Sequence, residues 1–71
     1  MERDIRKELA RRLRQLRREY HYSQQHLAEL ADLDYKHIQL LESPKAPYAR
    51  LDTIEQLAKA FKITPSKLLE F

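Results

Sequence analysis

The stretch SQQHLAELADLDYKHIQLLE, residues 23–42, decides the fold of this chain. Ser23 is a good helix N-cap, because its hydroxyl can accept hydrogen bonds from the free amide hydrogens of a first turn. Asp34 offers a second cap of the same kind. The stretch therefore predicts two short helices joined by a tight turn at residues 31–33. This is the sequence form of a helix-turn-helix, whose second helix can enter the major groove of DNA.

Each of the two predicted helices has one apolar face at helical spacing. Leu27, Leu30 and Ala31 form this face in the first helix. Ile38 and Leu41 form it in the second helix. The two faces can pack against each other and against the rest of the chain, so we expect an all-α fold.

Composition narrows the class of protein. The chain has 71 residues, which suits one domain with a small core. It has no glycine and only three prolines, and its charged, leucine-rich composition favours helix over strand. With no cysteine it has no disulfide and no thiolate metal site, and no apolar run approaches a membrane span. We expect a cytoplasmic protein without a cofactor, a membrane segment or a small-molecule substrate.

The net charge of +3 is unevenly distributed. Residues 1–20 carry eight Lys/Arg and four Asp/Glu, whereas residues 21–71 carry six and seven. A basic segment attached to a nearly neutral body suits a polyanionic partner. Many solvated surface helices have the same composition, so the charge alone favours a nucleic-acid partner only slightly.

A first helix is expected from about Asp4 to Tyr20. Its apolar side chains recur every three or four residues and form one stripe: Ile5, Leu9, Leu13, Leu16 and Tyr20. Its basic side chains fall on the opposite side: Arg3, Lys7, Arg11, Arg14 and Arg18. We interpret these cations as a solvated helix face, in preference to direct phosphate contact by most of them.

The C-terminal half predicts a loop and two more helices. Residues 43–49 cannot be helical, because Pro44 and Pro47 remove amide donors and push the residues before them toward extended geometry. The apolar face of the next helix, expected from about residue 51 to residue 61, consists of Leu51, Ile54, Leu57, Ala58 and Phe61. Thr64 is a cap followed by Pro65 at the first helical position, which predicts a short fifth helix.

The motif Ser23-Gln24-x-x-Leu27-Ala28, with Ile38, Leu41 and Glu42 after the turn, resembles the phage-repressor (Cro/cI, also called XRE) helix-turn-helix family. The resemblance continues at Leu13-Arg14-Gln15-Leu16-Arg17, Leu51-Asp52-Thr53-Ile54-x-x-Leu57-Ala58 and Ile63-Thr64-Pro65-Ser66-x-Leu68-Leu69. It extends from about Leu9 to Leu69. It implies a compact five-helix repressor-like DNA-binding domain, with the helix-turn-helix at helices two and three. Residues 1–71 would form this single domain, with flexible ends.

The resemblance also implies structural roles. Arg17 should form an ion pair with Glu42, at the end of the third helix. Asp32 stands where the family usually has glycine, at a position that needs a left-handed backbone, and aspartate is among the few other residues that tolerate it. Leu33 should turn inward between the two helices. The family often has glycine just after the glutamate, where this chain has Ser43, so the path of the loop over the DNA remains open.

The third helix is the expected reader of bases. Tyr35, Lys36, Gln39 and Leu40 lie on its expected outer face. Glutamine can bond adenine, lysine can donate to guanine, and an apolar tip can meet a thymine methyl group. The other interpretation is that these are ordinary surface residues, and Leu40 could instead cover the core.

Three further residues are candidates for phosphate contact. Gln24 opens the second helix, where free amides and the helix dipole favour an anion. The family match implies that this glutamine clamps the DNA backbone. Lys45 and Arg50 lie at the two ends of the loop into the fourth helix, where the family also contacts phosphates. It is equally possible that these two cations are ordinary solvent-exposed side chains without a DNA contact.

Other chemistry has little support in the sequence. His21, His26 and His37 do not form a helical metal pair, and no cysteine completes a metal site. No arrangement of nucleophile and base can be argued from spacing. We therefore expect no enzyme and no metal.

The sequence is compatible with two functions. The first is a sequence-specific double-stranded DNA-binding transcriptional regulator, a homodimeric repressor at an inverted-repeat operator. Its dimer surface would include Leu69 and Phe71, although both could simply close the core, as we expect Leu68 to do. The second is a protein-interaction module on the same fold, antitoxin-like or co-regulatory. The acidic residues that surround the third helix, Asp32, Asp34 and Glu42, and the scarcity of cations in that helix motivate this alternative.

Overall fold

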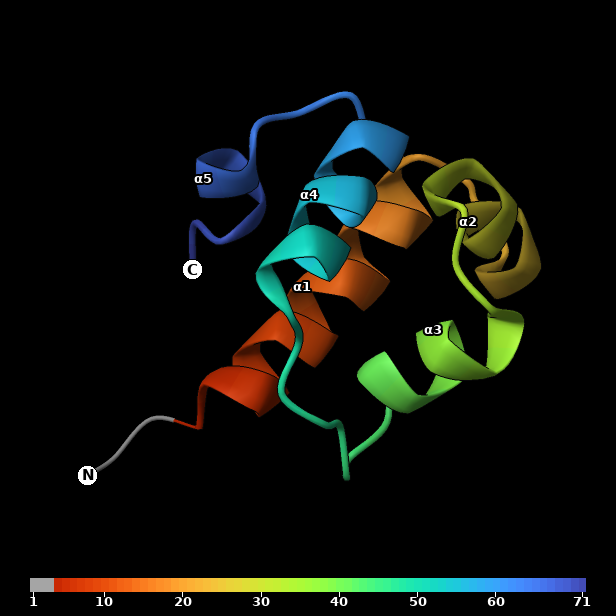
Figure 1. Cartoon of the computed structure of the whole chain (residues 1–71). Helices are drawn as coiled ribbons and strands as arrows, with labels where there is room; N and C mark the ends of the chain where they lie inside the picture. Colours follow the sequence, from red (N-terminus) through yellow and green to blue (C-terminus); the bar gives the residue numbers. More distant parts are fainter. Residues whose placement is uncertain (1–3) are drawn as a thin grey trace.

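The computed structural model describes residues 4–71 and shows five α-helices and no strand in that range (Figure 1). Their bounds are α1 Ile5–Glu19, α2 Gln24–Ala31, α3 Tyr35–Leu41, α4 Leu51–Ala60 and α5 Pro65–Leu68. Figure 1 shows α1 and α4 in the middle of the molecule, with α2 and α3 to one side and α5 to the other. The predicted all-α fold is confirmed. No helix within residues 4–71 is long and apolar enough to cross a membrane.

Polar side chains begin four of the helices. Each accepts a hydrogen bond from a backbone N–H of the first turn, and the four residues are Asp4, Ser23, Asp34 and Thr64. The predicted caps at Ser23, Asp34 and Thr64 are thus confirmed, as is Pro65 at the start of α5. At α1 the Arg6 side chain donates to Asp4, and this hydrogen bond holds the pKa of the Asp4 carboxyl below its usual value.

Three helices end in a residue with a left-handed backbone, and none of the three is glycine. They are His21, Asp32 and Lys62, with φ values of 57°, 57° and 58°. In each case the N–H of the following residue bonds to the carbonyl five positions back, which closes the helix end as a Schellman motif. The expectation for Asp32 is confirmed. The other two were not predicted, because histidine and lysine give no turn signal of their own.

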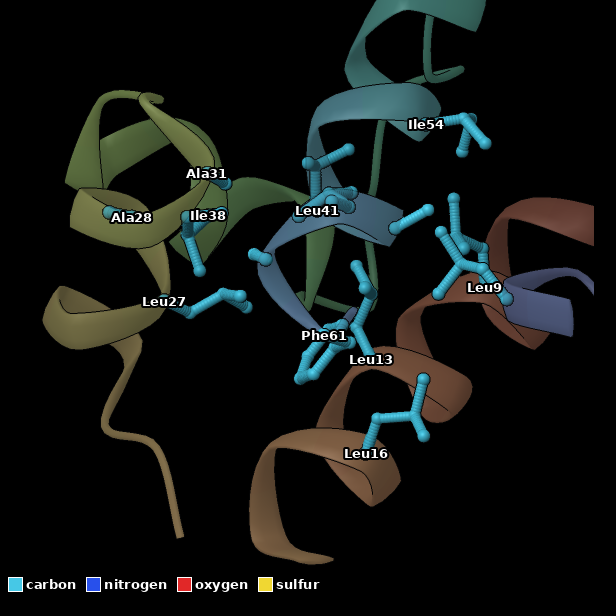
Figure 2. Packing of buried hydrophobic residues seen from close by; sticks show 14 residues of the cluster. Leu9, Leu13, Leu16, Leu27, Ala28, Ala31, Ile38, Leu41, Ile54 and Phe61 are labelled. Carbon is cyan, nitrogen blue, oxygen red and sulfur yellow. The ribbon is translucent and has the colours of Figure 1, made fainter. Parts of the chain in front are cut away.

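One hydrophobic cluster draws side chains from all five helices. It contains Leu9, Leu13, Leu16, Leu27, Ala28, Ala31, Ile38, Leu41, Ile54, Leu57, Ala58, Ala60, Phe61 and Leu68. Figure 2 shows these residues gathered from different helices, with Phe61 near the middle. Leu33 packs against the cluster from the turn, as predicted. Leu68 is fully buried, so the preference for a core role at that position is confirmed.

Three residues assigned to apolar faces are largely outside this core, so those assignments were wrong: Ile5, Leu30 and Leu51 are 58%, 46% and 85% exposed. Tyr20 is 37% exposed, but its ring packs edge-on against Phe61 with centroids 5.2 Å apart, in agreement with its place on the apolar stripe. In α2 the buried arc runs instead through Leu27, Ala28 and Ala31. Helical side chains lean toward the N-terminus of their helix. Leu51, the first residue of α4, therefore leans over the preceding loop rather than over the core.

Long-range hydrogen bonds hold the ends of several helices in place. Arg12 of α1 donates through Nε to the Leu68 carbonyl at 3.2 Å and through Nη2 to the Lys67 carbonyl at 3.0 Å. Phe71, the last residue of the sequence given, is half-buried and packs against the core. Tyr22, between α1 and α2, donates its hydroxyl to the Ala60 carbonyl at 3.3 Å.

The first prediction concerns the left-handed turn at Asp32. A residue with a Cβ atom costs about 1–2 kcal/mol in this conformation, while glycine adds about 0.4–1 kcal/mol of chain entropy to the unfolded state. Asp32→Gly should therefore raise the free energy of unfolding by about 0.5–1 kcal/mol. Equilibrium urea denaturation followed by circular dichroism measures this change.

Glu29→Gly provides the matched control, because Glu29 is an exposed residue within α2. It should lower the free energy of unfolding by about 1 kcal/mol. If both variants were destabilised alike, the left-handed backbone at Asp32 would not be a source of strain.

Candidate nucleic-acid interface

The outer face of α3 is exposed, while its inner face is part of the core. Ile38 and Leu41 are 0% and 1% exposed. The four residues predicted to read bases all lie on the exposed arc: Tyr35, Lys36, Gln39 and Leu40. The question whether Leu40 covers the core is answered, because that side chain is 53% exposed.

Both ends of α3 are closed by short polar contacts. The Asp34 carboxylate accepts from the Lys36 amide at 2.8 Å, so the cap uses part of its acceptor capacity. At the other end the Ser43 hydroxyl donates to the Leu40 carbonyl at 2.7 Å. These contacts fix the length of the helix. They leave the side chains of its outer face as the groups available to a partner.

A buried ion pair fixes the position of α3 relative to α1. Arg17 donates to both carboxylate oxygens of Glu42, with Nε–Oε2 and Nη2–Oε1 distances of 2.9 Å each. The Glu42 side chain is only 2% exposed, and that of Arg17 is 19% exposed. Arg17 also donates to the Tyr22 carbonyl at 3.1 Å. The ion pair implied by the family resemblance is therefore present and is shielded from solvent.

Gln24 joins this network from the first residue of α2. Its Nε2 donates to Glu42 Oε1 at 3.2 Å, so the carboxylate is shared by α1 and α2. Gln24 is the first residue of α2, as the sequence predicted. Its contact with Glu42 was not predicted. A glutamine amide has two donor hydrogens. The second hydrogen stays available for the predicted phosphate contact.

The assignment of Arg14 to a solvated face was wrong. Arg14 is half-buried and its Nη1 donates to the Glu42 main-chain carbonyl. Helical periodicity placed it opposite the apolar stripe correctly, but periodicity gives no information about a helix that packs alongside. Lys7, Arg11 and Arg18 of the same side are exposed. Arg3, the fifth member of that set, lies outside the described residues.

Lys45 and Arg50 are both exposed, as predicted, but their surroundings differ. The Arg50 side chain is 82% exposed and pairs with Asp52, at an Nε–Oδ1 distance of 3.3 Å. Lys45 lines a shallow surface hollow with Lys7, Arg6 and neighbouring residues. Asp4 also lines this hollow and pairs with Arg6, at an Nε–Oδ1 distance of 3.2 Å. The sequence did not predict that the start of α1 meets the loop after α3, because these segments come together only in the fold.

The described part of the chain offers little for metal chemistry. Within residues 4–71 no three or more histidine or acidic side chains converge so as to hold a metal ion. His26 instead packs edge-on against the ring of Tyr22, with ring centroids 4.8 Å apart.

A family model of the Cro/C1-type helix-turn-helix DNA-binding domain matches residues 12–71, which contain most of α1 and all of α2 to α5. The chain belongs to this family. The matched domain is a DNA-binding one, and α2 and α3 are the two consecutive helices joined by a tight turn within the matched range. Comparisons with curated proteins and with solved structures gave no significant match.

The second prediction concerns the Arg17–Glu42 pair. Arg17→Ala would leave Glu42 buried with an uncompensated charge and should lower the free energy of unfolding by about 3–5 kcal/mol. The neighbouring Arg18 is exposed, so Arg18→Ala should stay within about 0.5 kcal/mol of the parent. Urea denaturation of both variants measures the difference. An equal, small effect in the two variants would contradict a structural role for the pair.

Proposed function

We propose that the chain is a sequence-specific transcriptional regulator of double-stranded DNA, a homodimeric repressor that reads the major groove with α3. The observation that carries this proposal is the division of α3 into two faces. Ile38 and Leu41 anchor it in the core, and its exposed arc presents side chains that suit base edges. Occupancy of an operator that overlaps a promoter would repress transcription without any catalytic step.

Each proposed DNA contact has a distinct task. Tyr35, Lys36, Gln39 and Leu40 would meet base edges. Gln24, Lys45 and Arg50 would contact phosphates, with Gln24 at the start of α2 and the other two at the ends of the loop before α4. Phosphate contacts supply affinity and register, whereas base contacts supply specificity.

A second copy is proposed to pack on α5 and the residues that follow it. Leu69 is 38% exposed and Phe71 is half-buried, so both present apolar surface at the C-terminal end. Two recognition helices one DNA turn apart require a separation of about 34 Å. The molecule is 35 Å long in its largest dimension, so two adjacent copies could provide that separation.

We further propose that residues 1–71 act as one cytoplasmic domain. All five helices contribute to one core, and Arg12 joins α1 to α5, which supports a single cooperative unit.

A protein-interaction module remains the second candidate, because acidic residues flank α3. Asp32 and Asp34 are both exposed, and Lys36 is the only lysine or arginine in α3. An acidic rim lowers non-specific affinity for DNA, since that affinity depends on phosphate neutralisation. The same rim could face a basic partner protein.

The third prediction tests the regulator. Bound duplexes selected from a random pool at two salt concentrations should converge on an inverted repeat with half-sites about 10 base pairs apart. Lys36→Glu combined with Gln39→Ala should weaken binding to the selected duplex by at least about tenfold, because each base contact is worth about 1–3 kcal/mol.

Lys59→Glu is the control, since it makes the same charge change at an exposed position of α4. It should leave the preferred sequence unchanged. A pool with no enriched sequence, at low salt as well, would reject the regulator in favour of the protein-interaction module.

The fourth prediction tests the dimer surface. Leu69→Asp should place a charge in the proposed interface and shift the chain toward monomer. The shift is measured by sedimentation equilibrium. Binding to a full inverted repeat should weaken, whereas binding to an isolated half-site should stay unchanged. Leu30→Asp, at an exposed leucine of α2, should leave the monomer–dimer equilibrium unchanged if the interface lies at the C-terminal end.

A further inference from the structure

Leu40 is an exposed leucine at the C-terminal end of the proposed reading face, one residue before the end of α3. Its side chain is 53% exposed although Leu41, the next residue, is buried. It lies four residues after Lys36, so both occupy one ridge of α3, roughly 6 Å apart along the helix axis. A partner that covers this side chain gains the free energy of removing its apolar surface from water.

The polar groups next to Leu40 are already engaged. The Ser43 hydroxyl donates to the Leu40 carbonyl at 2.7 Å and therefore points back along the helix. The Glu42 carboxylate is turned inward to Arg17 and Gln24. Leu40 therefore presents methyl groups without a competing donor or acceptor from these two residues.

From this we infer that Leu40 is a specificity-determining residue that selects the C5-methyl group of thymine in the major groove. This inference rests on the proposed function and names the chemistry that one position of α3 would recognise. The thymine methyl is the apolar group on the major-groove edges of the four base pairs. Cytosine has only a hydrogen atom at that position, and the N7, O6, O4 and amino groups on those edges are hydrogen-bond acceptors or donors that a leucine cannot satisfy.

The selection works by attraction and by exclusion. Covering a thymine methyl with Leu40 removes apolar surface of both groups from water. Placing Leu40 against the amino group of cytosine or the oxygen of guanine would desolvate a polar group and give it no partner. A mismatched base is therefore rejected by the cost of that unpaired group.

The experiment replaces thymine by uracil in the duplex that the chain selects. Uracil keeps the Watson–Crick pairing and the O4 acceptor and lacks only the methyl group. At one thymine of one half-site, the substitution should weaken binding of the parent about fourfold, the equivalent of about 0.8 kcal/mol for one buried methyl-sized group. Substitution in both half-sites should weaken it about sixteenfold.

Two variants show whether Leu40 is the residue that senses the methyl group. Leu40→Ala should bind the thymine duplex and the uracil duplex with nearly equal affinity, as a double-mutant cycle requires of a direct contact. Leu30→Ala removes the same groups from an exposed leucine of α2 and should keep the fourfold preference for thymine.

Three results would overturn the inference. They are a parent that tolerates uracil at every thymine, a Leu40→Ala variant that keeps the preference, and a Leu40→Ala variant that loses self-association while binding both duplexes equally less. Each of these results would leave the proposed DNA-binding function intact, because the chain had already selected a DNA sequence. Failure of the regulator would appear earlier, as a pool without an enriched sequence, and would reject both proposals.

Discussion

The position of α3 depends on the hydrogen bonds to the buried carboxylate of Glu42. Glu42 receives Arg17 from α1 and Gln24 from α2, and its main-chain carbonyl receives Arg14. A carboxylate this deeply buried is tolerated only where several donors satisfy it. The three helices are therefore locked together at the C-terminal end of α3, and the outer face of that helix is held at one orientation. The same network removes a negative charge from the surface that would face DNA.

The local features of the fold were predictable from sequence because their causes are local. A hydroxyl or carboxylate at Ser23, Asp34 or Thr64 meets amides two or three residues away, and the left-handed turn at Asp32 depends on one residue. The apolar faces were predictable only in part. Whether Leu30 is buried depends on which helices pack beside it, and periodicity within one helix does not contain that information.

In the candidate site, too, the features with a local cause were predictable and the contacts between distant segments were not. The exposed arc of α3 could be predicted from helical spacing and the family resemblance, since positions 35, 36, 39 and 40 share one face of a helix. The roles of Arg14 and Arg12 could not, because each bonds to main-chain carbonyls in a distant segment, and a carbonyl has no sequence signature. Gln24 was placed correctly and its partner was missed for a similar reason: its bond crosses from the start of α2 to the end of α3.

The bond from Arg12 to α5 has a consequence for biosynthesis. A ribosome that has made only residues 1–63 holds a nascent chain in which Arg12 has no carbonyl partner in α5 and Leu9 lacks the cover of Leu68. The core is complete only when the last turn of helix has emerged. Folding of this domain therefore waits until α5 has emerged from the ribosome, and a chain interrupted before that point exposes apolar surface to proteases and chaperones.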